Sequence, residues 1–177
     1  MKPVKDLNIN KDTTLSELIE QFSNVGGFQA QELYRGYEIL KEMLNKAEIK
    51  VLSFPADIIS TGIRGIIREL IKRKMFDLVI TTCGTLDHDL ARLEKDYYLG
   101  YFEADDVYLR EKGIFRLGNV FIPEENYGFP IEKIMKDALE YIYNKGKKDI
   151  ATYELVWGIG EYLEKINHPK KEESIVY

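Results

Sequence analysis

Ile49-Lys50-Val51-Leu52-Ser53-Phe54 and, further along the chain, Asp77-Leu78-Val79-Ile80-Thr81-Thr82 are the two stretches that decide the fold. Both are short, largely apolar and rich in strand-forming residues, and Pro55 stops the first, so we expect two buried strands. Between them, Ser60-Thr61-Gly62 can start a helix of about four turns with lysine and arginine in its last turn. Its apolar positions recur at helical spacing: Ile63, Ile66, Ile67, Leu70 and Ile71. A strand, a helix and a strand predict a βαβ unit with parallel strands.

Helical patterns surround this unit. Thr14 and Glu17 fit a capping box, which predicts a short helix that ends before Gly26-Gly27. A second, longer helix is expected from Phe28 to about Lys46. Further helices are predicted at residues 86–93, 105–111, 130–143 and 152–165, with a strand at 118–123. The turn at 170–173 is predicted to be solvated, and residues 174–177 look like the beginning of a new apolar segment.

Composition limits the function classes. The 177 residues are 45% hydrophobic and 31% charged, which is typical of a globular protein with one core. A net charge of -5 argues against nucleic acid as the main partner, because such surfaces are normally basic. No apolar run or signal segment indicates a membrane, so we expect a cytoplasmic protein. The single cysteine, Cys83, excludes an internal disulfide and chemistry by paired thiols.

The loops that follow the two strands are the candidate site, because ligands bind at the carboxyl ends of parallel strands. Residues 55–62 could hold a phosphate through backbone N–H groups, hydroxyls and a glycine at a helix start. Residues 81–89 combine hydroxyls and a glycine with the acidic cluster Asp87-His88-Asp89, which would attract an amine. The dinucleotide fingerprint G-x-G-x-x-G is absent, so the pattern alone favours a plain helix cap at residues 60–62.

Metal binding and catalysis by a thiol are two further interpretations of these loops. Adjacent side chains point in different directions, so we expect no metal site at residues 87–89. A surface or helix-start histidine is as good an interpretation of His88 as a functional one. Cys83 is expected to be a small buried side chain at a strand end rather than a nucleophile.

Three motifs occur in a fixed order: Ile59-Ser60-Thr61-Gly62-Ile63-Arg64, then Thr81-Thr82-Cys83-Gly84-Thr85-Leu86-Asp87-His88-Asp89-Leu90, then Arg116-Leu117-Gly118-Asn119-Val120-Phe121-Ile122-Pro123. Gly27-Phe28-Gln29-Ala30 and Glu173-Ser174-Ile175-Val176-Tyr177 lie at either end of this series. Together the segments resemble successive motifs of the deoxyhypusine synthase family, with the character of its archaeal members.

The resemblance implies a fold and a reaction. The fold would be a single α/β domain over residues 1–177, with a Rossmann-like parallel sheet and helices on both faces. A helical arm, 1–47, would precede an NAD-binding region, 48–177, and the fold would be incomplete without the family's carboxy-terminal half. The reaction would be the NAD-dependent transfer of the aminobutyl group of spermidine to a lysine of the hypusine-containing translation initiation factor.

The resemblance also implies roles for individual residues. The cofactor-binding positions would be Asp57, Ser60, Thr82, Cys83 and Gly84. Asp87 and His88 would contact spermidine. The sequence departs from the family here, since many members have two glutamates in place of Asp87 and His88 and an asparagine in place of Asp57.

The family's nucleophilic lysine lies in the later half of its sequence, so we nominate no catalytic residue here. We expect the chain to be inactive without that half, supplied by a separate chain or a missing segment, in a homo- or hetero-tetramer. Two alternatives stay open: a catalytically silent regulatory or binding subunit paired with an active homologue, and an unrelated NAD-binding Rossmann module.

Overall fold

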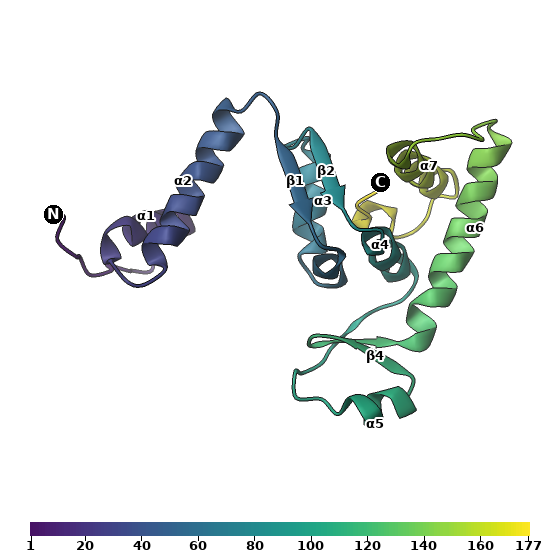
Figure 1. Ribbon diagram of the computed structural model, residues 1–177, viewed down its shortest axis with the longest axis horizontal. Coiled ribbons are helices and arrows are strands. Elements are labelled where there is room, and N and C mark those ends of the chain that lie inside the picture. The colour runs from purple at the N-terminus through teal and green to yellow at the C-terminus, as the bar shows by residue number, and fades with distance from the viewer. The chain divides into compact units, whose positions relative to one another are not determined.

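The computed structural model describes residues 1–177 and divides them into two compact units, Met1–Lys50 and Val51–Tyr177 (Figure 1). Both units contain helices, and all strands lie in the second. None of the helices combines the length and apolar character that crossing a bilayer requires.

The first unit is a pair of helices, α1 (Leu15–Val25) and α2 (Ala30–Lys46). The predicted capping box is confirmed: the Thr14 N–H donates to Glu17 Oε2 at 2.8 Å, and the Glu17 N–H donates to Thr14 Oγ1 at 3.3 Å. Gly26 ends α1 with a φ of 68°, a left-handed conformation that favours glycine. No residue of either helix is fully buried, so the pair has no closed core of its own.

The second unit begins with the predicted βαβ arrangement. Strands β1 (Val51–Phe54) and β2 (Leu78–Thr81) are parallel, with Val51 opposite Leu78 and Phe54 opposite Thr81. The mixed α/β class with a parallel sheet is therefore confirmed. Inward-facing residues of the strands pack with the buried Ile67 of helix α3 (Arg64–Lys72). The alternate residues Val51, Leu78 and Ile80 are about half exposed.

Helix α3 is shorter than predicted at both ends: it starts at Arg64, after the 3-10 turn η1 (Ala56–Ser60), and it ends at Lys72, before Lys74 adopts a φ of 52°. Thr61 then has an extended backbone, with φ -106° and ψ 178°, and its Oγ1 accepts a hydrogen bond from the Ile63 N–H at 3.2 Å. Regular helix starts only at Arg64. The hydroxyls that we expected at a helix start therefore belong to the turn.

Three helices build the main core. Helix α4 (Gly84–Glu94) follows β2, and it packs on α6 (Gly128–Asn144), which packs on α7 (Thr152–Lys165). Figure 1 shows α4 between the sheet and α6. The buried core residues come from these helices and the end of the chain: Leu90, Leu93, Ile134, Ala138, Ile159, Leu163 and Val176. Because α4 starts two residues earlier than predicted, Asp87 and His88 lie in its first turns.

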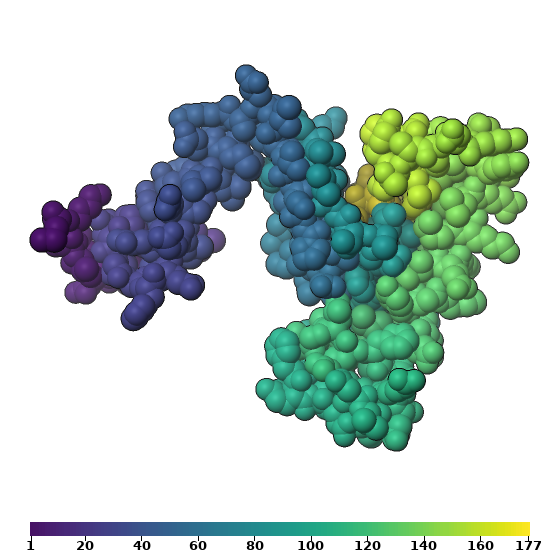
Figure 2. Space-filling model, viewed as in Figure 1, coloured from purple at the N-terminus to yellow at the C-terminus, as the bar shows by residue number.

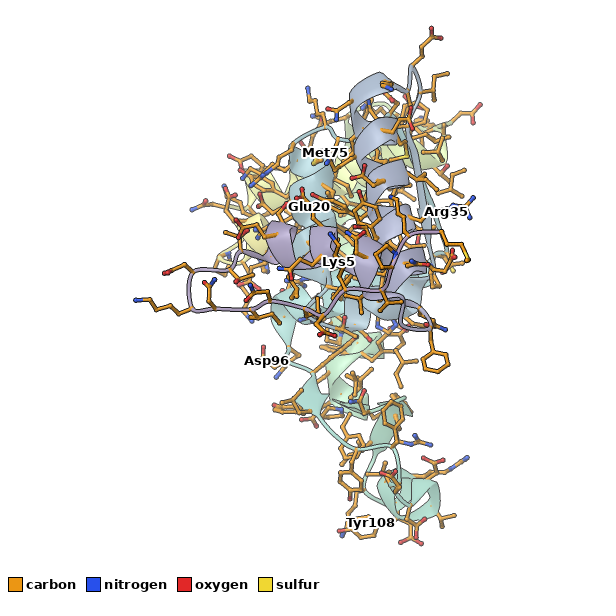
Figure 3. The ribbon with its side chains drawn as sticks, turned by 90° about the vertical axis from the view of Figure 1, so that its left-hand side faces the viewer. Lys5, Glu20, Arg35, Met75, Asp96 and Tyr108 are labelled. Carbon is orange, nitrogen blue, oxygen red and sulfur yellow. The ribbon has the colours of Figure 1, made fainter.

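An antiparallel sheet lies between α4 and α6 in the sequence. Its strands are β3 (Tyr98–Leu99), β4 (Ile114–Leu117) and β5 (Val120–Pro123), in the order β3-β5-β4, and α5 (Asp106–Glu111) precedes β4. Strand β5 and helix α5 were predicted, whereas β3 and β4 were not. The sheet projects from the rest of the second unit (Figure 2). In Figure 3, Asp96 lies where this sheet joins the rest of the second unit, and Tyr108 of α5 lies at the opposite end.

The end of the chain folds against α7. The turn η3 (Lys171–Glu173) has no buried residue, as predicted for a solvated turn, and it also contacts α7. Ser174 and Val176 are buried. The Val176 carbonyl approaches α7 so closely that a Cβ on Gly160 would lie 2.2 Å from its oxygen. The apolar character of residues 174–177 therefore serves packing against this helix.

Candidate functional site

The loops after β1 and β2 are joined into one surface. The Ala56 N–H donates to Thr82 Oγ1 at 3.2 Å, which ties the start of the first loop to the second. Where α4 begins, a Cβ on Gly84 would lie 3.1 Å from the Ala56 Cβ, so the two loops touch and little space remains for a larger residue. The predicted positions in the two loops therefore belong to one continuous site.

A second group of contacts fixes the same edge of the sheet. Thr81 Oγ1 donates to the Phe54 carbonyl at 2.8 Å and lies 2.6 Å from Thr85 Oγ1. These bonds connect the carboxyl end of β1, the end of β2 and the first turn of α4. The strand ends thus position the helix that carries Asp87 and His88.

In the first loop, the structure separates the two predicted cofactor contacts. Ser60 is buried, and its hydroxyl donates to the Asp57 carbonyl at 2.6 Å. The Asp57 side chain is exposed. Ser60 therefore holds the shape of the turn, while Asp57 presents its carboxylate at the surface.

In the second loop, Thr82 and Cys83 are exposed and Gly84 is the first residue of α4. The expectation that Cys83 is buried is wrong, because the side chain lies outside the packing of β2 and α4. No side chain caps the amino terminus of α4. The N–H groups of Thr85 and Leu86 donate to the carbonyls of Thr82 and Cys83, which leaves the Gly84 N–H free of bonds within the chain. A free N–H at the positive end of a helix favours an anion, so this corner fits a phosphate-bearing ligand.

Asp87 and His88 lie beside two tyrosines that the sequence did not identify. Tyr127 donates its hydroxyl to Asp87 Oδ2 at 3.4 Å, and Tyr97 Oη lies 3.0 Å from His88 Nδ1. His88 is 8% exposed, so the interpretation as a surface histidine is wrong. Burial lowers the pKa of His88, although the carboxylates of Asp87 and Asp57 partly oppose this effect. Asp57 and Asp87 are thus each close enough to His88 for their charges to act on it.

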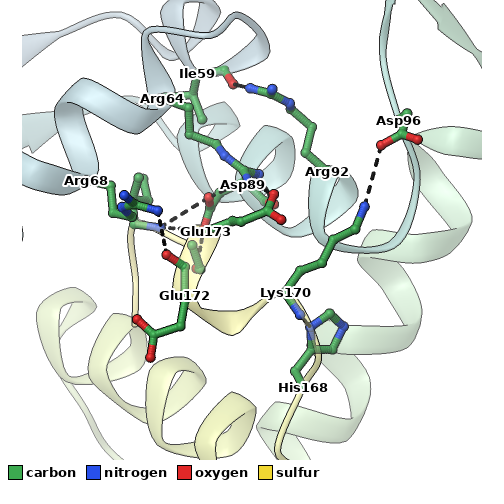
Figure 4. A network of polar contacts seen from close by, with 12 residues as sticks. Ile59, Arg64, Arg68, Asp89, Arg92, Asp96, His168, Lys170, Glu172 and Glu173 are labelled. Atoms are coloured by element: carbon green, nitrogen blue, oxygen red, sulfur yellow. Dashed lines mark hydrogen bonds and ion pairs between the residues drawn. The ribbon is translucent and has the colours of Figure 1, made fainter.

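Asp89 does not belong to this surface, so the expected cluster of residues 87–89 is divided. Its side chain is 0% exposed and accepts hydrogen bonds from Ser174 Oγ at 2.5 Å and from the Ile175 N–H at 3.1 Å. Arg64 Nη1 lies 3.7 Å from Asp89 Oδ1, and Arg64 Nη2 donates to Glu173 at 3.1 Å. Figure 4 shows this group beneath α4. Burial raises the pKa of Asp89, while its hydrogen bonds and Arg64 oppose the shift.

Arg92 is a further positioning residue that the sequence did not reveal. Its guanidinium donates to the carbonyls of Ile59 at 2.7 Å and Thr61 at 2.6 Å, which holds the first loop against α4 (Figure 4). The same guanidinium lies 5.9 Å from the centre of the Tyr97 ring. The loop, the helix and the tyrosine are therefore linked by one cation.

The family model for deoxyhypusine synthase matches residues 17–177. The chain belongs to the deoxyhypusine synthase family. The ordered motifs that suggested this family are thereby supported over nearly the whole chain, and the alternative of an unrelated NAD-binding Rossmann module is set aside.

Relatives with the name "Probable deoxyhypusine synthase" come from archaea. The protein from Picrophilus torridus is 54% identical over 176 residues, which is 99% of this chain and 54% of that protein. The protein from Thermoplasma acidophilum is 48% identical over the same share of each chain. The protein from Ignicoccus hospitalis is 47% identical over 94% of this chain and 51% of its own. The chain thus spans about half the length of the curated relatives it matches.

A solved structure shares the fold. It is the crystal structure of a "putative deoxyhypusine synthase" from Entamoeba histolytica, with a TM-score of 0.56 and 18% sequence identity. The similarity covers 98% of this chain and 59% of that one. At this identity, the comparison supports the fold of the deoxyhypusine synthase chain and not the roles of its residues.

Proposed function

We propose that this chain provides the cofactor-binding and amine-binding loops of a deoxyhypusine synthase. The reaction would transfer the aminobutyl group of spermidine to a lysine of the hypusine-containing translation initiation factor, with NAD as cofactor. The observation that carries the proposal is the hydrogen bond between Ala56 and Thr82. It joins the first loop, which presents the Asp57 carboxylate, to the start of α4, which carries Asp87, in a chain of this family.

The first part of the proposal concerns NAD, which accepts and returns a hydride when it is bound. The amino terminus of α4 offers the Gly84 N–H to the pyrophosphate, with the exposed Thr82 and Cys83 beside it. The positive end of the helix dipole would offset phosphate charge. Gly62 and Gly65 leave open space at the start of α3, since a Cβ on either would meet no atom within 4 Å. These residues fit a dinucleotide along the loop edge, with the Asp57 carboxylate as a hydroxyl acceptor.

The second part concerns the polyamine. Asp87 presents a carboxylate that is held by Tyr127, and both it and the exposed Asp57 carboxylate lie near His88. Carboxylates bind ammonium groups through charge-assisted hydrogen bonds, which are stronger than neutral ones. We assign the amine end of spermidine to Asp87, beside the cofactor loop. His88 lies next to it in the same helix turn.

Binding measurements test both assignments. Isothermal titration of the 177-residue chain should detect NAD, and should detect spermidine in the presence of NAD. Asp87→Asn should weaken spermidine binding roughly 10- to 100-fold, because it removes the negative charge that strengthens the bond to the ammonium group and adds a competing amide donor, and should leave NAD binding nearly unchanged. Asp149→Asn, in an exposed loop between α6 and α7, is the matched control with the same change in charge. Equal losses in the two variants would contradict the assignment of Asp87.

The nucleophilic lysine is a separate part of the proposal. We expect it to come from the part of the family sequence that corresponds to the later half of the relatives. The chain incubated with NAD and spermidine labelled in its aminobutyl group should then attach no label to protein, whereas adding a polypeptide that spans the later half of a relative should place the label on a lysine of that polypeptide. Turnover by the chain alone would contradict this expectation. Binding without turnover in either mixture would instead favour a silent binding subunit.

A further inference from the structure

His88 has a defined partner on one of its two ring nitrogens. Tyr97 Oη lies 3.0 Å from Nδ1, and the two rings meet edge to face with their centres 5.8 Å apart. Tyr127 covers another side of the imidazole, with ring centres 5.4 Å apart. The ring is therefore held in one orientation by two tyrosines from different parts of the chain.

The Tyr97 hydroxyl is the donor of the hydrogen bond to His88 Nδ1. The Tyr97 hydroxyl has one proton and makes no other hydrogen bond in the structure. If His88 Nδ1 were the donor, the phenol proton would have no partner in a largely buried site, which is unfavourable. The phenol therefore donates and Nδ1 accepts.

The protonation states agree with this direction. Burial raises the pKa of Tyr97, so its phenol keeps the proton. Burial lowers the pKa of His88, so the imidazole is neutral at physiological pH. A neutral imidazole that accepts at Nδ1 carries its single proton on Nε2.

The Nε2 atom is available to a ligand. Arg68 Nε is the one buried side-chain nitrogen or oxygen that lacks a hydrogen-bond partner. His88 Nε2 makes no hydrogen bond within the chain, so it is not sealed in the core. It lies in the same turn of α4 as the Asp87 carboxylate.

We propose that Tyr97 is a positioning residue that fixes His88 as an Nε2–H donor, so that Asp87 and His88 recognise different atoms. The inference rests on the proposed function of Asp87 as the ammonium contact. An ammonium group has donors and no acceptor, so it cannot pair with Nε2–H. This corner of the site therefore takes one ammonium group, at Asp87, beside one acceptor atom, an oxygen or an uncharged nitrogen, at His88.

The tautomer can be measured directly, without any ligand. Long-range ¹H–¹⁵N NMR of chain labelled at its two histidines distinguishes a proton on Nδ1 from one on Nε2. His168 is an internal reference, because its Nδ1 accepts from the Lys170 N–H at 3.2 Å and its Nε2 lies 3.1 Å from Glu94 Oε1. We expect Nε2–H at both histidines in the unaltered chain. A proton on Nδ1 of His88 would overturn the inference.

Removing the tyrosine hydroxyl tests the cause. Tyr97→Phe should convert His88 to a mixture of tautomers and leave His168 unchanged, which also reports that the chain is folded. Tyr108→Phe, at an exposed tyrosine of α5, is the matched control and should change neither histidine. An unaltered His88 tautomer in Tyr97→Phe would overturn the role of Tyr97.

Spermidine affinity is an independent test. Structural damage would weaken binding, whereas the proposed role of Tyr97 predicts tighter binding in Tyr97→Phe. Once Tyr97→Phe allows His88 to present a bare Nε2, spermidine should bind roughly two- to tenfold more tightly, as one added neutral acceptor allows. Unchanged or weaker binding in Tyr97→Phe would overturn the selectivity argument. If spermidine does not bind the unaltered chain, the proposed function fails, whereas the tautomer measurement still decides the assignment of His88 as a donor.

Discussion

The hydrogen bond between Ser174 and Asp89 gives a quantitative test of how the end of the chain is held under α4. Both side chains are fully or almost fully buried, and their oxygens are 2.5 Å apart. Ser174→Ala removes one hydrogen bond to a charged group, which should lower the free energy of unfolding by about 2 kcal/mol. Asp89→Ala removes the buried carboxylate that accepts from Ser174 and faces Arg64, which keeps only its ion pair with the half-exposed Glu173; this should cost about 4 kcal/mol.

The two substitutions remove opposite ends of the same bond, so their effects should not add. The double variant should be about as unstable as Asp89→Ala alone, which corresponds to a coupling energy of about 2 kcal/mol. Urea unfolding at pH 7, followed by circular dichroism, measures each free energy. Ser53→Ala, at an exposed serine on β1, is the matched control and should change stability by no more than about 0.5 kcal/mol. Additivity within about 0.5 kcal/mol would refute the argument that Ser174 acts through Asp89.

Three further outcomes follow from close contacts and from one pKa. Gly160→Ala should lower the free energy of unfolding by about 1–3 kcal/mol in urea titrations, because its Cβ would lie 2.2 Å from the Val176 carbonyl oxygen. Gly65→Ala, in open space on α3, should instead raise it by about 0.5–1 kcal/mol, and a loss there would show that the effect at Gly160 is not specific. Gly84→Ala should weaken NAD binding roughly tenfold in titration calorimetry, because it pushes the two loops apart; unchanged affinity would place the cofactor elsewhere. The folded chain binds a proton at His88 less readily than the unfolded chain does, so stability should fall as the pH drops below the ordinary value of 6.5. Thermal unfolding between pH 5 and pH 8, roughly the range in which histidine titrates, measures this effect. The loss of stability with falling pH should be smaller in His88→Asn than in the unaltered chain. An equal loss in both would show that other groups cause the pH dependence.

The parts of the fold that were predicted correctly depend on signals within a few residues. Thr14 and Glu17 form the expected capping box because both partners lie in one turn. The βαβ unit was recognisable because two apolar runs and one helical pattern follow each other directly. The predicted start of α3 was wrong because the Thr61 hydroxyl binds the local backbone, and no periodicity reveals that competition.

The candidate site depended on information that spacing does not contain. Asp87 and Asp89 are two residues apart, which places them about 200° from each other around a helix, but this follows only once α4 is known to start at Gly84. The partner of Asp89 is Ser174, 85 residues away. Tyr97 and Tyr127 reach the site from segments whose own patterns indicate no function. Family resemblance supplied the positions to inspect, and the packing separated Asp87, which faces the site, from Asp89, which faces the core.

Helix α4 links ligand binding to the packing of the end of the chain. One side of it presents Asp87 and His88, and the other binds the backbone N–H of Ile175 through Asp89. If a ligand binds only while α4 is folded in its observed position, the ligand stabilises that position, and the contacts that depend on it, against local unfolding. At a ligand concentration of 100 times Kd this stabilisation is about 2.7 kcal/mol. The Ile175 N–H, which donates to Asp89, should therefore exchange with solvent more slowly when a site on the opposite side of the helix is occupied, and local opening of the end of the chain would lower the affinity of that site by the same free energy.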